Sequence, residues 1–152
     1  MAKDTKERIL AAALELFSKN GYAGTNIREL TASLGLVKSA MYKHFESKED
    51  IWNTLLDEMI VYYDTHFGSP EHLPPVPDTL EELAEMTRQM VNFTVHDEKV
   101  VMTRKLLTIE QFRDDRARGL ATKHFMTGLR DMFTPIFQGM MDKGIVCFLL
   151  FC

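Results

Sequence analysis

Apolar residues recur every three or four positions along almost the whole chain, and this helical spacing constrains the fold more than any other feature. In the first segment, Ile9, Ala13, Leu16 and Phe17 follow this spacing. No stretch of useful length alternates apolar and polar residues as a half-buried strand does. The sequence therefore predicts an all-α protein.

Residues that favour helix ends divide this pattern into segments. The predicted N-caps are short polar residues, which accept hydrogen bonds from the free amides of a first helical turn: Asp4 or Thr5, Thr25, Ser47, Asp78, Asp97 and Asp114. The predicted helices span about residues 4–20, 26–34, 38–44, 48–66, 79–95, 98–112 and 115–142. Four prolines predict a loop over residues 68–78, and Pro135 is expected to kink or divide the last helix.

Composition argues against several classes of protein. The only cysteines, Cys147 and Cys152, exclude a disulfide framework elsewhere and favour a reducing, cytoplasmic location. We find no signal peptide and no run of the roughly 20 apolar residues that a membrane span needs. No catalytic loop motif is present and the histidines lack metal-ligand spacing, so we expect no enzyme activity, no cofactor and no metal site.

Charge is distributed unevenly between the two parts of the chain. The net charge is −4, but residues 1–52 carry eight Lys and Arg against seven Asp and Glu. Residues 53–152 carry ten against fifteen. The acidic residues 53–152 would be repelled by nucleic acid, which leaves the mildly basic residues 1–52 to contact it.

Residues 25–45, TNIRELTASLGLVKSAMYKHF, have the layout of a helix-turn-helix. Two short helical segments flank a tight turn at Gly35, and in such a motif the second helix enters the major groove of DNA. Apolar residues such as Leu30 and Met41 can hold the two helices together. Lys38, Ser39, Lys43 and His44 are then left facing outward, where small and cationic side chains can meet bases and phosphates.

Residues 7–59 resemble the DNA-binding domain of the TetR/AcrR family of transcriptional regulators. The resemblance is carried by I-L-x-A-A-x-x-L-F at 9–17, by the glycine and threonine of 21–25, and by Y-x-H-F-x-S-K-E at 42–49. Residues 105–114 and 133–145 resemble the family's effector domain only loosely. The resemblance implies a three-helix DNA-binding head at residues 1–50 and a helical effector-binding and dimerisation domain at residues 51–152.

The resemblance also implies a role for each residue of the motif. Tyr42 and Lys48 would bind phosphates, and Thr25 would cap the second helix and contact a phosphate. The groove-facing set would be Lys38, Ser39, Lys43 and His44, with Arg28 as a further contact. The sequence departs from the family at Val37, where a capping Ser or Thr is usual, and at Thr31, where Ala is usual.

Simpler interpretations remain open for several of these residues. Tyr42 can instead serve in packing, although the motif around it favours the phosphate contact. His44 can equally serve in packing, and Lys48 alone is an ordinary solvated charge. In the body, methionines and phenylalanines are expected mainly to form a helical core. Some of them can instead line an adaptable apolar pocket, because Met suits varied hydrophobic ligands; the predicted ligand-binding set is Met86, Met90, Phe93, Met102, Phe112 and Phe125.

The resemblance implies a homodimeric repressor that binds a palindromic operator in double-stranded DNA and is released by a small hydrophobic effector. The alternative is a shortened regulator that acts through protein interactions without productive DNA binding. The apolar ending, residues 145–152, lacks the further helices usual in the family, and it predicts a truncation or frameshift near Ile145.

Overall fold

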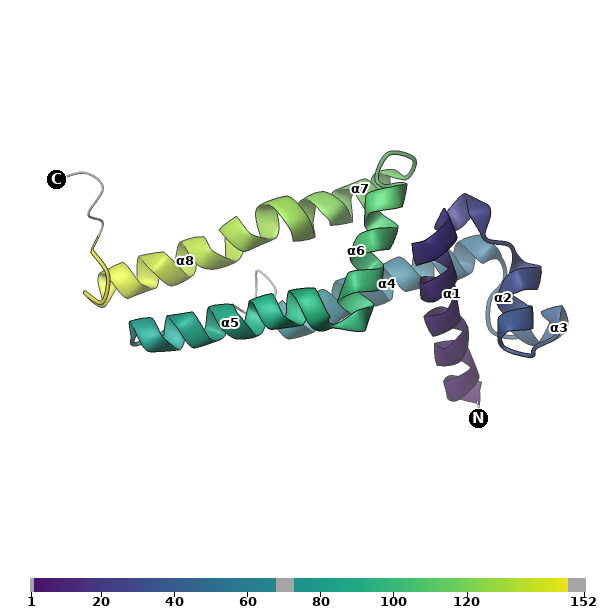
Figure 1. The fold of residues 1–152 in the computed structure, drawn as a ribbon, viewed down its shortest axis with the longest axis horizontal. Coiled ribbons are helices and arrows are strands. Elements are labelled where there is room, and N and C mark those ends of the chain that lie inside the picture. The colour runs from purple at the N-terminus through teal and green to yellow at the C-terminus, as the bar shows by residue number, and fades with distance from the viewer. Residues whose placement is uncertain (1, 68–72, 148–152) are drawn as a thin grey trace.

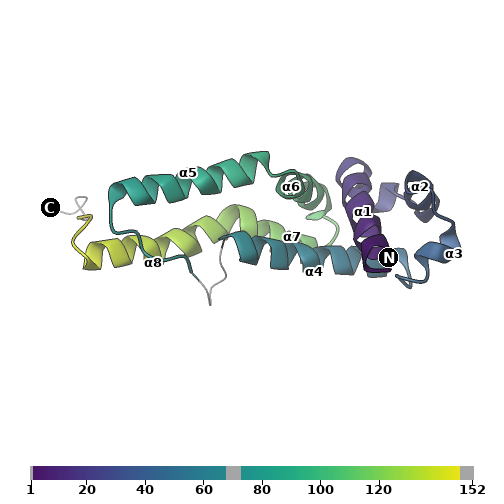
Figure 2. The ribbon, with the colours of Figure 1, turned by 90° about the horizontal axis from the view of Figure 1, so that it is seen from below.

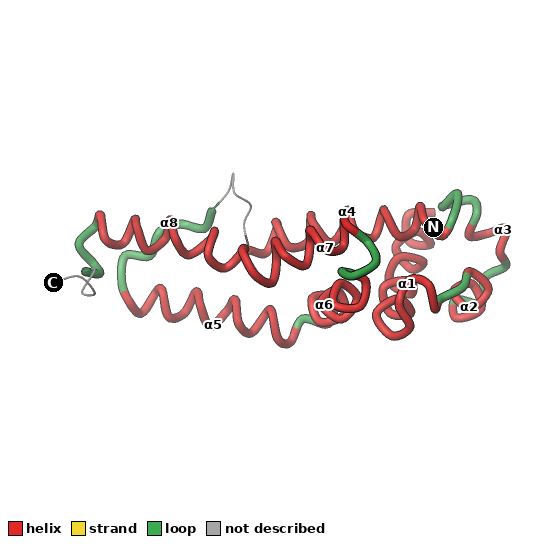
Figure 3. The backbone as a smooth tube through the Cα atoms, turned by 90° about the horizontal axis from the view of Figure 1, so that it is seen from above, coloured by secondary structure: helices red, strands yellow, loops and turns green. Residues whose placement is uncertain are grey.

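A computed structural model describes residues 2–67 and 73–147, and within these ranges every regular element is helical (Figures 1 and 3). The prediction of an all-α protein is confirmed. The elements are, in order, α1 (Ala2–Gly24), α2 (Ile27–Ser33), α3 (Lys38–Met41), α4 (Lys48–Phe67), α5 (Leu80–His96), α6 (Glu98–Glu110), α7 (Asp115–Thr122), the π-helical turn η1 (Lys123–Thr127) and α8 (Gly128–Asp142).

The molecule is elongated, with α1, α2 and α3 at one end and a body in which α4, α5 and α8 run lengthwise (Figure 2). The helices α1 and α6 lie across this direction and pack against each other. Phe17 of α1, Leu55 of α4 and Leu106 of α6 belong to one cluster of buried side chains. The hydrophobic core is therefore continuous from the N-terminal helices into the body.

The helices α4, α6 and α7 begin at the predicted capping residues, whereas the cap of α5 is one residue later than predicted. The side chains of Ser47, Asp97 and Asp114 accept hydrogen bonds from the amides three residues further on, at 2.7–3.0 Å. The prediction of Asp78 as a cap is wrong, because Thr79 caps α5 by accepting from the amide of Glu82 at 3.1 Å. Thr79 fits because its backbone is already extended.

The first helix starts earlier than predicted, and its predicted end near residue 20 is a bend after which the helix continues to Gly24. It begins at Ala2, so Asp4 and Thr5 lie within its first turns and do not cap it. Gly21, with φ 73° and ψ 168°, interrupts the helical conformation before a last turn to Gly24. Only glycine adopts this backbone conformation without strain.

The last helical region is divided at a different place from the one predicted. Pro135 lies inside α8 without ending it, and the break is the π-helical turn η1. Gly128 is needed at this turn, since a Cβ there would lie 2.7 Å from the carbonyl oxygen of Lys123. A π-turn widens the helix locally and is often found beside functional sites.

The predicted loop and the apolar tail lie partly outside the described residues. Residues 73–77 of the loop have no regular structure, and Val76 packs against Gly139 of α8. The chain turns after α8 at Gly144, whose φ is 70°, while residues 148–152 of the predicted tail are not described. None of the described helices is long and apolar enough to cross a membrane.

Candidate DNA-binding surface and body pocket

The helices α2 and α3 are joined by a short turn that requires glycine. Gly35 has φ 65°, which glycine adopts at no steric cost. Its amide donates to the carbonyl of Ala32 at 3.1 Å, and the amide of Leu36 donates to the carbonyl of Thr31 at 2.9 Å. These bonds close the end of α2, and the predicted helix–turn–helix layout is confirmed.

The cap of α2 is Asn26, and the prediction of Thr25 as the cap is wrong. The Asn26 side chain accepts from the amide of Glu29 at 2.9 Å. The Thr25 hydroxyl instead donates to the carbonyl of Gly21 at 3.0 Å, and its side chain is buried. Thr25 therefore stabilises the bend of α1 and presents no free hydroxyl to a phosphate in this structure.

The second helix of this motif, α3, is shorter than predicted. It spans Lys38–Met41, and Tyr42 to His44 form a turn rather than a further helical turn. Both His44 and Phe45 donate their amides to the carbonyl of Met41, at 2.9 and 3.1 Å. The side chains of Met41 and Phe45 are fully buried, so they fix the turn to the core beneath it.

Five predicted DNA-contacting residues lie exposed on α2, α3 and the following turn, at the end of the molecule farthest from the body (Figure 1). We call them the recognition surface: Arg28, Lys38, Ser39, Tyr42 and Lys43. Half of the Tyr42 surface is exposed, so Tyr42 is not a core residue. His44 is half-buried and borders this surface.

Lys48 is the first residue of α4 and lies where α4 meets α1. Its ammonium group is 4.2 Å from the ring centroid of Tyr22 and 6.0 Å from that of Phe17. Burial lowers the pKa of Lys48, and the nearby Glu110 acts in the opposite direction. The Lys48 side chain thus makes cation–π contacts within the protein, and its phosphate contact stays a prediction.

The region where α1 meets α4 and α6 includes polar contacts that sequence reasoning missed. The buried carboxylate of Glu110 accepts from the amide of Tyr22 at 2.8 Å. The indole of Trp52, which packs on Phe17 and Tyr22, donates to Asp114 at 3.3 Å. The sequence held a signal for Glu110, because it follows the buried Leu106 and Leu107 at helical spacing.

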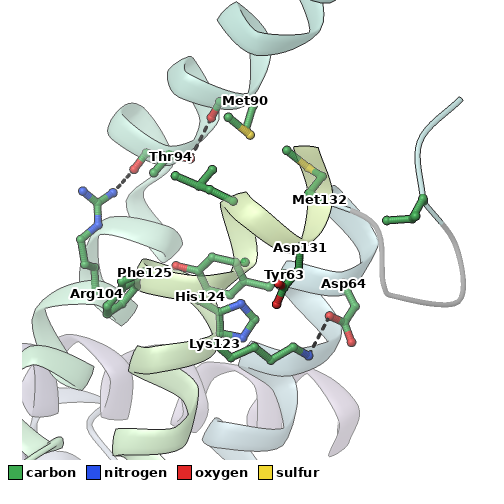
Figure 4. A pocket seen from close by; sticks show the side chains of 13 residues that line it. Tyr63, Asp64, Met90, Thr94, Arg104, Lys123, His124, Phe125, Asp131 and Met132 are labelled. Atoms are coloured by element: carbon green, nitrogen blue, oxygen red, sulfur yellow. Dashed lines mark hydrogen bonds and ion pairs between the residues drawn. The ribbon is translucent and has the colours of Figure 1, made fainter. Parts of the chain in front are cut away.

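The body contains a cavity of about 280 Å³ between α4, α5, η1 and α8 (Figure 4). Of the six predicted ligand-binding residues, Met90 and Phe125 line it. Phe112 does not line this cavity, and 83% of its surface is exposed to solvent. Phe93 stacks on His66 with ring centroids 4.6 Å apart, Met102 packs against the core, and Met86 is half-buried outside the cavity lining.

Two ring side chains that the sequence analysis did not select also form the cavity wall. His124 of η1 stacks on Tyr63 of α4 with centroids 4.2 Å apart. Burial, with a smaller effect of Lys123, lowers the pKa of His124 to about 4, against the opposing charge of Asp64. Burial raises the pKa of Tyr63 to about 12. Both rings are therefore uncharged at neutral pH.

These features define a class of protein: a helix-turn-helix head with an exposed polar recognition surface, joined through a shared core to a helical body with an apolar cavity. Residues 9–55 match the sequence profile of the family described as bacterial regulatory proteins, tetR family. The match shows that residues 9–55 are similar to the DNA-binding part of this family of transcriptional regulators, and the resemblance inferred from the sequence is confirmed there.

Curated relatives share mainly the N-terminal part of the chain. The chain is 46% identical over 46 residues to the HTH-type regulator YerO of Bacillus subtilis, covering 30% of this chain and 16% of YerO. It is 28% identical to the regulator AcrR of Shigella flexneri, covering 64% and 45%, and 30% identical to the repressor BepR of Brucella suis, covering 64% and 52%. The chain thus spans about half the length of these relatives, or less.

Two solved structures share the fold over nearly the whole chain. A protein from Mesorhizobium loti assigned to the TetR family aligns with a TM-score of 0.63 and 23% identity, covering 95% of this chain and 71% of that one. A mutant of HlyIIR aligns with a TM-score of 0.62 and 20% identity, covering 98% and 78%. The body, like the head, therefore has a known arrangement of helices.

Proposed function

We propose that this chain is a DNA-binding transcriptional repressor that acts in the cytoplasm. The observation that carries the proposal is the recognition surface, whose cationic and polar side chains are exposed while Met41 and Phe45 anchor the same turn in the core. Cationic side chains supply affinity for phosphates, and small neighbours such as Ser39 permit close approach to bases. Repression is supported by relatives described as a repressor, BepR, and as a negative regulator, IcaR.

The proposed partner is a palindromic operator bound by a homodimer. Two recognition helices about 34–36 Å apart would enter successive major grooves on one face of the duplex. The acidic body favours this orientation, because it is repelled by phosphates and leaves the head as the contact surface. Sedimentation analysis of the protein with and without DNA measures the number of chains per duplex.

We further propose that a small apolar effector binds the body cavity and releases the DNA. Support comes from α4, which begins beside the head at Lys48 and carries Tyr63 and Asp64 into the cavity lining. A ligand that favours one position of α4 would change the separation of the two heads. The ligand can shift the equilibrium between two positions of α4 only by the difference in its affinity for them.

The test begins with selection of bound sequences from random duplex DNA, followed by fluorescence anisotropy on the selected duplex over a range of salt concentrations. We expect a palindromic consensus and an affinity that falls steeply with salt, because counterions are released from phosphates. Absence of binding at about 50 mM salt would contradict the proposal and favour a protein that acts only through protein interactions.

A further inference from the structure

The body cavity is lined mainly by apolar side chains. Leu73, Met90, Phe125, Leu129 and Met132 form most of the apolar wall. This composition fits a hydrophobic ligand rather than a polar one. Two of these residues are methionines, whose flexible side chains adapt to ligands of different shape.

The charged side chains of the lining have partners within the protein. The Lys123 ammonium lies 3.6 Å from the Asp64 carboxylate, and Arg104 donates to the backbone carbonyl of Thr94 (Figure 4). Asp131 pairs with Arg130 at 2.7 Å. Lys123, Asp64 and Asp131 each have a partner of opposite charge, whereas Arg104 has a backbone acceptor only. The mainly apolar wall therefore favours an uncharged ligand, because burial of a charge away from water is unfavourable.

One side chain of this wall, His124, has a ring nitrogen that is left without a partner. Among the described residues, Nε2 of His124 is a buried side-chain nitrogen that makes no hydrogen bond. The ring that carries it is held by its stack on Tyr63. Because an unsatisfied buried polar group costs free energy, a ligand group that bonds to this nitrogen gains more than one that merely fills space.

We propose that the cavity binds an uncharged ring compound with one hydroxyl group, and that this hydroxyl hydrogen-bonds Nε2 of His124. The inference rests on the proposed function in that it takes this cavity as the effector site. A hydroxyl suits the position because it donates to an unprotonated nitrogen and accepts from a protonated one, so it satisfies either tautomer. The nitrogen is covered in this structure, so the hydroxyl reaches it once a neighbouring side chain of the cavity wall moves.

The test measures binding to DNA-free protein by calorimetry, using three probes of one size: 1-naphthol, 1-methylnaphthalene and 1-naphthoate. We expect 1-naphthol to bind about ten-fold or more tightly than 1-methylnaphthalene, since one neutral hydrogen bond is worth about that factor. The charged 1-naphthoate should bind more weakly than 1-naphthol, because it loses its hydration in an apolar cavity; tighter binding of 1-naphthoate would indicate pairing with Arg104 and would overturn the proposal. Equal affinities for 1-naphthol and 1-methylnaphthalene would overturn the proposal.

The variant His124→Phe keeps a ring against Tyr63 and removes both nitrogens, so it should abolish the preference for 1-naphthol. The control is Met126→Leu in the same turn, where the side chain is 75% exposed and outside the cavity lining. Retention of the preference in His124→Phe would also overturn the proposal. If that variant does not fold, the ¹⁵N shift of Nε2 in the wild-type protein must respond to 1-naphthol and not to 1-methylnaphthalene.

DNA binding by the same preparations separates the two proposals. If no probe binds to protein that still binds its selected duplex, the ligand inference is wrong and the regulatory function stands. If 1-naphthol binds with the expected preference but the protein binds no DNA, the assignment of the site stands and its role as an effector site is wrong.

Discussion

The carboxylate of Glu110 and the backbone amide of Tyr22 form a hydrogen bond of 2.8 Å between residues 88 positions apart in the sequence. It joins the last turn of α6 to the bend of α1. The neighbouring Gly21 leaves room for it, because a Cβ at that position would lie 2.8 Å from a Glu110 oxygen. The body is thereby held against the head at the point where α1 leaves helical conformation.

Replacing Glu110 with Ala should destabilise the protein by about 1–3 kcal/mol, because the Tyr22 amide loses its acceptor in a largely buried site. Glu110→Gln keeps an acceptor oxygen and should cost less. Urea unfolding measures both. Glu7→Ala, on an exposed position of α1, is the control. A Glu110→Ala variant as stable as this control would show that the contact contributes nothing.

Lys38 and Lys43 are predicted to contact phosphates through exposed side chains on α3 and its following turn. Replacing either with Ala should weaken binding to all duplexes by a similar factor. It should lower the salt dependence by about two counterions per dimer, one for each chain. Anisotropy at several salt concentrations measures this slope. Lys105→Ala, an exposed lysine on α6, is the charge-matched control. An unchanged slope in both recognition-surface variants would place the DNA elsewhere.

Val37 occupies the N-cap of α3 with an extended backbone and no side-chain hydrogen bond. Val37→Ser should stabilise the protein by about 0.5–2 kcal/mol, because the hydroxyl can accept from a free amide of the first turn. Little burial is lost, since Val37 is 67% exposed. The control is Val61→Ser, equally exposed but inside α4, where no cap is needed. The melting temperature should rise in Val37→Ser and should not rise in Val61→Ser. An equal change of melting temperature in the two variants would contradict the prediction.

Gly139 lies where α8 meets the segment before α5. A Cβ at this position would lie 2.7 Å and 2.9 Å from the two methyl carbons of Val76. Gly139→Ala should therefore lower the free energy of unfolding by about 1–3 kcal/mol through overpacking. The second substitution Val76→Ala, added to Gly139→Ala, should restore part of this stability. Gly119→Ala is the matched control, since nothing lies within 4 Å of a Cβ there. Equal stability of the two alanine variants would show that Gly139 and Val76 are not in close contact.

The helices and the recognition turn could be predicted because they depend on short-range signals. Capping side chains such as Ser47 and Asp97 act within four residues, and Gly35 marks the turn by its own backbone preference. The errors at Thr25 and Asp78 have a common cause. Two adjacent residues each offered a capping oxygen, and sequence alone does not tell which backbone is extended.

The body cavity was harder to predict because it depends on contacts between distant segments. Met90 and Phe125 line it, while Phe112, of the same chemical type, is exposed. The pair that the sequence analysis missed, His124 and Tyr63, is in contact because His124 lies in the π-turn. Gly128 is the one local feature of the sequence that could have predicted this turn. Helical spacing gives the face of each helix, not the partner that covers it.

The depressed pKa of His124 makes stability depend on pH in a predictable direction. In the unfolded chain a histidine has its pKa near 6.5, while burial beside Tyr63 and Lys123 lowers the pKa of His124 to about 4 in the folded protein. Between these values the unfolded state binds more protons, so stability is complete above about pH 6.5 and falls as the pH is lowered toward 4.

The expected loss by pH 5 is about 1–2 kcal/mol, less than the full pKa shift implies because solvent screens the partly exposed ring. Urea unfolding at pH 7.5, 6 and 5 measures it, with His124→Phe as the comparison, since groups common to both proteins cancel in the difference. The wild-type protein should lose more stability over this range than the variant. Parallel losses would mean that His124 is protonated as readily in the folded protein as in the unfolded chain, and the buried, neutral ring proposed as the ligand's hydrogen-bond partner would then have no basis.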